Sequence, residues 1–151
     1  MISLSGKTYL VTGVADNVGF GWHIAKKIQA AGGEVVLAVH PRVAGIVEKF
    51  LTKEKYAASR KLYDGEVNVA KQEFRPSSVF KCDVSLDTGE NSIDELVNNL
   101  RSSGKTLDGI VHSVAFSPEA KLPHFETSRE AYLTAMSVSS YSLVAMCNKL
   151  H

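Results

Sequence analysis

The 151-residue sequence predicts an α/β fold with a doubly wound parallel sheet. Two observations lead to this prediction: short, continuously apolar segments rich in β-branched residues alternate with amphipathic helical segments, and a glycine-containing turn follows the first apolar segment. Continuous apolar strands are typical of a parallel sheet, because helices cover such a sheet on both faces. Right-handed crossovers between the strands then produce the doubly wound arrangement.

Two strand–helix pairs are expected at the start of the chain. Thr8–Thr12 is a short apolar, β-branched segment and is predicted to be the first buried strand. The segment His23–Ala31 carries its apolar residues on one helical face, and the glycines after it favour a helix end. Val35–Val39 is predicted to be the second strand, and Pro41 to open a helix around Val43–Leu51, because proline is favoured near a helix start.

An irregular insertion is expected before the alternation resumes. Lys53–Pro76 is polar, and we interpret it as an insertion that carries one short helix. Ser78–Cys82 is predicted to be the third strand. The next helix is expected at Ser92–Arg101, with Ser92 as its N-cap and Glu95 as the capping-box partner.

The fourth strand is expected within Leu107–Val114, and a proline-containing loop follows it. Thr127 and Glu130 form a second capping-box pattern, which predicts a helix that runs toward the C-terminus. The predicted order is therefore strand, helix, strand, helix, insertion, strand, helix, strand, helix, as a doubly wound sheet requires.

Composition and charge exclude several classes of protein. The chain holds 17 basic and 16 acidic residues, a net charge of +1, so neither nucleic acid nor an anionic membrane is an expected partner. The apolar segments are strand-length, and the first residues do not have the pattern of a secretory signal. Cys82 and Cys147 have no CxxC partner or nearby His pair, which predicts free thiols in the cytosol and no metal site.

A glycine-rich segment, Gly13–Trp22, follows the first predicted strand and contains Gly13, Gly19 and Gly21. Ligands of doubly wound sheets bind at the carboxyl ends of the strands, where glycine lets the backbone approach a pyrophosphate and the next helix presents its positive end. The spacing differs from the common G-x-G-x-x-G pattern, so a plain glycine-rich turn is the alternative. The position of the segment between a buried strand and a helix favours phosphate binding.

The residues after the second predicted strand leave the choice of cofactor open. An acid normally stands here to bind the adenosine ribose of NAD, but the sequence reads Val-His-Pro-Arg at 39–42. His40 is a candidate to pack on adenine, and Arg42 is a candidate to meet a 2′-phosphate. A surface role for both residues is the alternative, so NADH and NADPH remain open.

The third and fourth strand ends supply further candidate contacts. The carboxylate of Asp83 is placed to accept a hydrogen bond from the adenine amino group, and the backbone N–H at Val84 to donate to the ring. The alternative for Asp83 is a role in capping the turn that follows the strand. Small residues around Val114 let the backbone lie against the cofactor ribose. His112 lies in an apolar strand, where a structural histidine is the commoner case, and no catalytic role is assigned to it.

Four segments together resemble the enoyl-acyl-carrier-protein reductases, members of the short-chain dehydrogenase/reductase superfamily with a stretched glycine motif. These segments are Gly13–Trp22, Asp83–Val84, His112–Phe116 and Ser139–Ser142, and the resemblance covers the whole chain. The insertion at Lys53–Pro76 and the stretch Phe125–Arg129 resemble the branch of the family found in plastids and some intracellular bacteria.

The resemblance implies a Rossmann fold, a cofactor and a reaction. Such enzymes transfer a hydride from NADH to the β-carbon of a trans-2-enoyl thioester on acyl carrier protein, in fatty-acid biosynthesis, and they are usually homotetramers. By position, the residues implied to line the cofactor are Gly13, Gly19, Phe20, His40, Asp83, Val84 and Val114. Ser117 is implied to lie near the substrate.

The family's catalytic pair is a Tyr followed seven positions later by a Lys, and this chain contains no such pair. The four-position spacing of ordinary relatives is missing too: Tyr141, which we interpret as a packing or interface residue, is followed by Ala145 and Asn148. We therefore expect residues 1–151 to be the N-terminal part of a single Rossmann domain, incomplete at the C-terminus and inactive alone. The alternatives are a non-catalytic dinucleotide-binding remnant and a ketoacyl-type reductase of the same superfamily.

Overall fold

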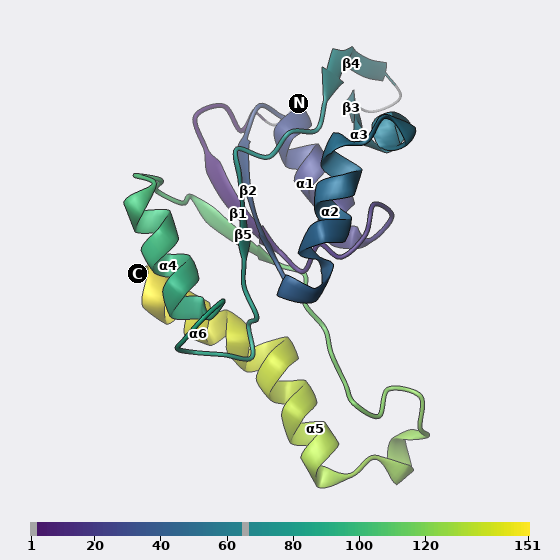
Figure 1. The fold of residues 1–151 in the computed structure, drawn as a ribbon, viewed down its shortest axis with the longest axis vertical. Helices are drawn as coiled ribbons and strands as arrows, with labels where there is room; N and C mark the ends of the chain where they lie inside the picture. Colours follow the sequence, from purple (N-terminus) through teal and green to yellow (C-terminus); the bar gives the residue numbers. More distant parts are fainter. Residues whose placement is uncertain (1–2, 65–66) are drawn as a thin grey trace.

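A four-stranded parallel sheet lies at the centre of the computed structural model, which describes residues 3–64 and 67–151 (Figure 1). The strands run in the order β5–β2–β1–β6, and their bounds are Ser78–Lys81, Glu34–Val39, Thr8–Thr12 and Gly109–His112. All four predicted strands are therefore confirmed, and so is the parallel, doubly wound arrangement. In register, Leu10 of β1 lies opposite Val36 of β2 and Ile110 of β6.

Helices cover both faces of this sheet, as the continuous apolar strands predicted. Helices α1 (Phe20–Ala30) and α2 (Ala44–Thr52) pack on one face, and α4 (Ile93–Ser102) and α6 (Ser142–Leu150) on the other. Helix α1 begins three residues before the expected position. The helix expected around residues 43–51 is α2, preceded by a 3₁₀ turn, η1 (Pro41–Val43), that Pro41 opens.

Two hydrophobic clusters form the core, one on each face. The cluster under α1 and α2 is made by Val11, Val14, Trp22, Ala25, Ile28, Val35, Leu37, Val39, Val47, Phe50, Leu62 and Phe74. The cluster under α4 and α6 is made by Leu10, Val36, Ala38, Cys82, Ile93, Leu96, Val97, Leu100, Ala145 and Met146. Successive residues of β1 and β2 alternate between the two clusters, because neighbouring side chains of a strand point to opposite faces.

The insertion contains more structure than the sequence predicted. It begins with a 3₁₀ turn, η2 (Glu54–Tyr56), and the one expected short helix, α3 (Ala57–Arg60). An antiparallel hairpin of β3 (Lys61–Asp64) and β4 (Val67–Glu73) follows and was not predicted. The sequence held a signal for it, because Asp-Gly at 64–65 is a common hairpin-turn dipeptide.

Arg60 ties the insertion to the rest of the fold. It is only 4% exposed, and its Nη1 donates to the carbonyl oxygens of Phe50 at 3.0 Å and Lys53 at 2.9 Å. Its Nε donates to Glu73 Oε2 at 3.1 Å. A guanidinium is tolerated in this buried position because these carbonyl and carboxylate oxygens replace the water that it loses.

Of the two predicted capping boxes, the first is confirmed in part and the second is wrong. Ser92 is the N-cap of α4, since its Oγ accepts from the backbone N–H of Glu95 at 3.3 Å, but the Glu95 carboxylate accepts from the N–H of Asn91 instead of Ser92. The prediction of Thr127 as an N-cap is wrong. The cap of the following helix is Ser128, whose Oγ accepts from Ala131 N at 3.1 Å.

The C-terminal helical region is continuous but not uniformly α-helical. It consists of α5 (Arg129–Met136), a π-helical turn η4 (Ser137–Tyr141) and α6, and it is preceded by a 3₁₀ turn, η3 (His124–Glu126). Figure 1 shows α5 extending beyond the sheet, with the loop before it folded back at the lower end of the molecule. Among the described residues, no helix is long and apolar enough to cross a membrane.

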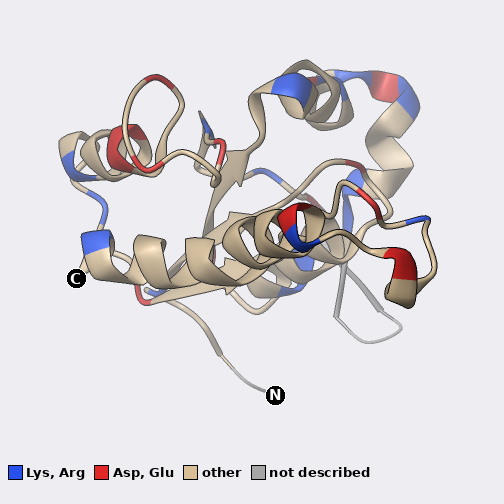
Figure 2. Ribbon diagram, turned by 90° about the horizontal axis from the view of Figure 1, so that it is seen from below, with Lys and Arg blue, Asp and Glu red and all other residues tan. Residues whose placement is uncertain are grey.

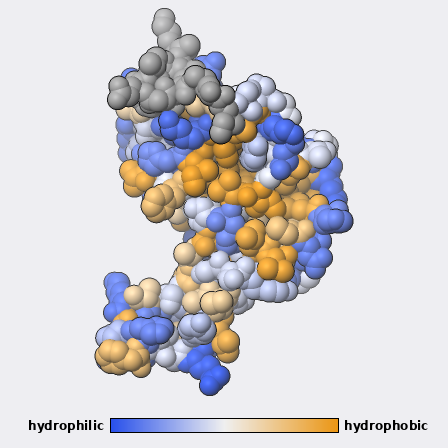
Figure 3. Space-filling view, turned by 180° about the vertical axis from the view of Figure 1, so that it is seen from behind, coloured by the Kyte–Doolittle hydropathy of each residue, from blue (hydrophilic) through white to orange (hydrophobic). Residues whose placement is uncertain are grey.

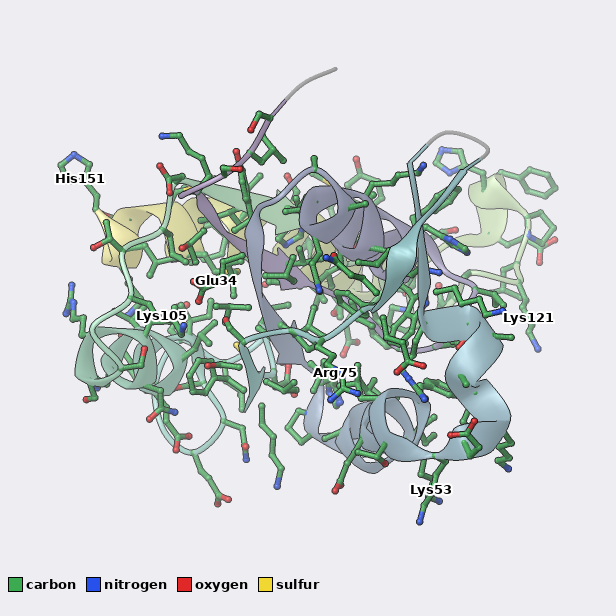
Figure 4. All side chains as sticks on the ribbon, turned by 90° about the horizontal axis from the view of Figure 1, so that it is seen from above. Glu34, Lys53, Arg75, Lys105, Lys121 and His151 are labelled. Carbon is green, nitrogen blue, oxygen red and sulfur yellow. The ribbon has the colours of Figure 1, made fainter. Side chains whose placement is uncertain are left out.

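Lys and Arg positions are interspersed with Asp and Glu positions along the ribbon (Figure 2). Lysines form ion pairs with acidic residues that are distant in the sequence: Lys7 with Asp108 at 2.7 Å, Lys149 with Asp94 at 2.5 Å, and Lys105 with Glu34. The last pair is labelled in Figure 4, where the two side chains lie next to each other. Surface ion pairs of this kind contribute little to stability, so the two core clusters hold the fold together.

Candidate nucleotide-binding site

A pocket of about 490 Å³ opens at the carboxyl ends of all four strands of the parallel sheet. Its wall comes from the residues that follow β1, β2, β5 and β6, and from the C-terminal helical region. The lining residues are Gly13, Val14, Ala15, Ala38, His40, Arg42, Val43, Cys82, Asp83, Val84, Ser85, Ser113, Val114, Ala115, Phe116, Thr134 and Val138. This is the edge at which ligands of open α/β sheets bind.

The bend after β1 packs closely on the loop after β6 at Gly13. The φ angle of Gly13 is +76°, and a Cβ at this position would lie 2.0 Å from the carbonyl oxygen of Ser113. Only glycine fits there, both because its φ lies in the left-handed region and because the neighbouring backbone occupies the space of a side chain. The bend after β1 and the loop after β6 therefore form one continuous part of the pocket wall.

Asp16 makes an unpredicted contact within the same bend. Its Oδ1 accepts from the backbone N–H groups of Val18 at 2.9 Å and Gly19 at 2.5 Å. These two N–H groups point at a carboxylate of the chain itself. Helix α1 then begins at Phe20 with Gly19 as N-cap and no side-chain capping hydrogen bond. The positive end of the α1 dipole favours an anion, and in this structure the Asp16 carboxylate already lies beside it.

His40 and Asp83 meet across the pocket wall from neighbouring strands. His40 Nε2 lies 3.2 Å from Asp83 Oδ2, and His40 Nδ1 accepts from the N–H of Arg42 at 3.1 Å. Because Nδ1 is an acceptor, the ring carries its proton on Nε2 and donates it to the carboxylate. Both residues were predicted to lie at strand ends, but their pairing was not predicted.

The Asp83 carboxylate is also held by Ser85. Its Oδ1 accepts from Ser85 N at 3.0 Å and from Ser85 Oγ at 2.6 Å. Burial disfavours the ionised form, but these hydrogen bonds and the nearby His40 ring outweigh it and lower the pKa of Asp83 below its usual value. The residue is therefore an anion at neutral pH. Asp83 braces its own turn, as the alternative interpretation expected. It also lines the pocket, where its contact with adenine stays a prediction.

His112 is held in a way that suits the structural role preferred for it. Its Nε2 lies 2.7 Å from Ser142 Oγ, and the Ser142 hydroxyl donates to Val138 O at 2.7 Å. The ring is half-buried, and this desolvation lowers the pKa of His112. His112 therefore joins the end of β6 to the C-terminal helical region.

Five of the predicted site residues lie together in the pocket wall: Gly13, His40, Asp83, Val84 and Val114. The other three are not among the lining residues. Gly19 lies at the start of α1, Phe20 is 84% exposed beside it, and Ser117 follows the lining residue Phe116. Thr134 and Val138 line the pocket and were missed, because nothing in the sequence indicated which face of the C-terminal helical region meets the strand ends.

The fold and the pocket together define a class: α/β proteins that bind a nucleotide at the carboxyl edge of a parallel sheet. Residues 56–151 match the family model described as enoyl-(acyl carrier protein) reductase. The chain belongs to this family, as its four motif segments had indicated.

Curated relatives from plants and bacteria are similar to nearly the whole chain. The NADH-dependent enoyl-acyl-carrier-protein reductase 2, chloroplastic, of Oryza sativa is 36% identical over 96% of this chain and 42% of its own length. The enzyme FabI of Aquifex aeolicus is 34% identical over 97% of this chain and 47% of its own length. The chain thus spans less than half the length of these relatives.

Solved structures show the same relationship. The Plasmodium berghei enoyl-acyl-carrier-protein reductase with triclosan superimposes with a TM-score of 0.84 at 26% identity, over 95% of this chain and 54% of that one. The Anaplasma phagocytophilum reductase in complex with NAD gives a TM-score of 0.73 at 28% identity, over 99% of this chain and 50% of that one. The Rossmann-like fold of this chain is therefore shared with known reductases.

Proposed function

We propose that the pocket binds NADH and that the protein containing this chain is an enoyl-acyl-carrier-protein reductase of fatty-acid biosynthesis. The observation that carries the proposal is the convergence of Gly13, His40, Asp83 and Val114 on one pocket, although they come from four different strand ends. Relatives named as NADH enzymes, and a solved relative in complex with NAD, support the same choice of cofactor.

The residues present suit a dinucleotide. The Asp83 carboxylate and the Val84 backbone would take the adenine, with His40 holding Asp83 in place. The N-terminus of α1 would take the pyrophosphate, and we keep Gly19 and Phe20 in this group because they form that N-terminus. Val114 would lie against the ribose on the nicotinamide side. Arg42 also lines the pocket, so NADPH stays an alternative.

The bound cofactor would supply the hydride that reduces the trans-2-enoyl thioester carried by acyl carrier protein. The residues of this chain would bind and orient that cofactor and help to exclude water from it. Ser117, directly after the lining residue Phe116, is proposed to lie near the substrate. None of the five Tyr residues is followed by a Lys at either family spacing, so we assign the stabilisation of the enolate to no residue of this chain.

A binding experiment on the full-length protein tests the cofactor proposal. NADH is titrated while its own fluorescence is followed, since Trp22 is buried in the cluster under α1 and α2 and is a poor reporter of the pocket. We expect saturable binding that Asp83→Ala weakens about tenfold or more, a loss of about 1.4 kcal/mol. Asp87→Ala, at an exposed position outside the pocket wall, is the control. Absence of binding at millimolar NADH contradicts the proposal.

A second assay addresses the reaction. The full-length protein is supplied with crotonyl and acetoacetyl thioesters in turn, and the oxidation of NADH is recorded. The proposal expects turnover with the crotonyl thioester. Turnover with the acetoacetyl thioester alone would identify a ketoacyl-type reductase instead, and no turnover with either would favour a non-catalytic dinucleotide-binding protein.

We also propose that residues 1–151 are the N-terminal part of one Rossmann domain with an insertion at 53–76, and that the whole protein is a homotetramer. Both core clusters flank one sheet, which supports a single domain. Exposed apolar side chains along α5 and α6 support an oligomer: Tyr132, Leu133, Met136 and Val144. Sedimentation velocity of the full-length protein tests the assembly, and a monomer at micromolar concentration would contradict it.

The cytosol is the proposed location. Cys82 and Cys147 are both free, which suits a reducing compartment, although relatives from plants are named as chloroplastic. Cell fractionation with an antibody to the chain decides between the cytosol and an organelle.

A further inference from the structure

The loop after β6 is held by one hydroxyl of the C-terminal helical region. Ser139 Oγ accepts from the backbone N–H of Phe116 at 3.0 Å and donates to the carbonyl oxygen of the same residue at 3.2 Å. One side chain thus satisfies both backbone groups of a residue that lies 23 positions away. We call this pair of hydrogen bonds the Ser139 clamp.

Ser139 lies in the π-helical turn η4. Such turns are rare and occur frequently at functional sites, because the wider turn redirects the side chains that a helix presents. Directly after this turn, Ser142 Oγ contacts His112 Nε2 at 2.7 Å. The two serines therefore fix the two ends of one segment, His112 at the end of β6 and Phe116 beyond it.

The segment between these anchors forms part of the pocket wall. Residues 113–117 belong to no helix or strand, so regular backbone hydrogen bonds do not set their shape. Ser113, Val114, Ala115 and Phe116 all line the pocket, and Thr134 and Val138 of the C-terminal helical region line it beside them. The Ser139 clamp thus attaches the irregular segment 113–117 to the C-terminal helical region.

We propose that Ser139 is a positioning residue of the cofactor site. Its hydroxyl holds the backbone of Phe116, and so keeps the wall at Val114–Phe116 in the shape that receives the nicotinamide end of the cofactor. The inference rests on the proposed function, because it assumes that NADH occupies this pocket. It adds a role for a residue that does not line the pocket itself.

Amide hydrogen exchange of the cofactor-free full-length protein tests the clamp itself. In Ser139→Ala the N–H of Phe116 loses its acceptor, and we expect it to exchange about tenfold faster or more. Ser139→Thr keeps a hydroxyl and restores slow exchange. Ser140→Ala, an exposed serine of the same π-helical turn, is the matched control and leaves exchange unchanged. Equal exchange of Phe116 in wild type and Ser139→Ala overturns the clamp.

NADH affinity of the same variants tests the positioning role. We expect the dissociation constant to rise about three- to tenfold in Ser139→Ala and to recover in Ser139→Thr, with Ser140→Ala like wild type. Wild-type binding that Ser139→Ala leaves unchanged overturns the inference alone. Failure of the wild type to bind NADH overturns the proposed function, and the positioning role with it. Circular dichroism checks folding, and Ser139→Cys, which keeps the side-chain volume, replaces the alanine variant if that variant unfolds.

Discussion

The two faces of the sheet are closed in different ways. On the α1 face, Trp22 packs edge-on against Phe50 at 6.2 Å and Phe74 at 5.0 Å between ring centroids, and Trp22 Nε1 donates to Ser59 O at 3.3 Å. On the α4 face, α4 and α6 cover the sheet, but α5 extends past its edge. In the view of Figure 3, hydrophobic residues reach the surface in the middle of the molecule and on the lower lobe, where α5 lies.

The difference shows what the insertion contributes. Phe74 and Leu62 come from the insertion, and both are fully buried in the α1 cluster. The insertion thus completes one core. The α4 cluster receives nothing comparable, and the apolar residues of α5, such as Leu133 and Met136, stay exposed. The α1 face is therefore expected to be sensitive to truncation of its side chains, whereas α5 is expected to tolerate it.

Trp22→Ala gives the largest effect that this comparison predicts. Removing a fully buried indole from its aromatic neighbours is expected to reduce the free energy of unfolding by about 3–5 kcal/mol. Phe125→Ala, at an 87% exposed position before α5, is the control and is expected to change it by less than about 0.5 kcal/mol. Urea unfolding followed by circular dichroism measures both. Similar losses in the two variants would contradict the contrast.

Gly13→Ala tests the close packing of the bend after β1 against the loop after β6. Left-handed backbone strain and the clash with the Ser113 carbonyl are expected to cost about 3 kcal/mol of unfolding free energy and to weaken NADH binding. Gly45→Ala in α2, where a Cβ would meet nothing within 4 Å, is expected to stabilise the chain by up to about 1 kcal/mol. A neutral Gly13→Ala would show that the two loops separate freely.

Arg60→Met sharpens the role of the insertion. The carbonyl oxygens of Phe50 and Lys53 lose their donor, so a destabilisation of about 2 kcal/mol is expected. Arg75→Met removes a charge from an 81% exposed side chain and is expected to cost less than about 0.5 kcal/mol. The same urea titration separates the two, and equal costs would contradict a buried anchor.

The Asp83 carboxylate, which follows β5, is expected to make the free energy of unfolding depend on pH in acid. Because its pKa in the folded chain lies below the usual value, its stabilisation is complete above about pH 5 and is lost as the pH falls through the folded pKa. Asp83→Asn cannot ionise and is expected to flatten the decline of the unfolding free energy below about pH 5. Urea titrations at several pH values test this, and parallel declines would contradict it.

The smallest expected effect concerns the reactivity of the two cysteine thiols. Burial is the main cause that raises the pKa of Cys82, in the α4 cluster, to about 12, so its unreactive thiol form persists at neutral pH. Cys147 on α6 is exposed. We expect Ellman's reagent to modify one thiol per chain in buffer and the second only in denaturant. Cys147→Ser is expected to remove the fast reaction, and a fast reaction that survives it would contradict the assignment.

Sequence reasoning located the sheet and most of the pocket wall for a physical reason. Four apolar runs specified four parallel strands, and parallel strands end at one edge, which placed His40 and Asp83 at the same edge of the sheet. Their direct contact also needs β2 and β5 to be neighbours, and the apolar runs do not specify the strand order. It did not predict that Asp16 binds the N–H groups of Val18 and Gly19, because such local contacts depend on the path of a bend. The π-helical turn at Ser139 was missed too, because tertiary contacts with the β6 loop accompany it and helical periodicity carries no sign of it.

Trp22 stands within the glycine-rich segment, yet its indole packs against Phe74 and donates to the carbonyl oxygen of Ser59, both in the insertion. The glycine-rich segment Gly13–Trp22 and the insertion at 53–76 are therefore packed together and depend on each other for their structure. A chimera that grafts the Gly13–Trp22 segment onto a scaffold without residues 53–76 would leave a bulky aromatic without its lining. Transplanting this nucleotide bend between scaffolds thus requires both pieces to be moved together.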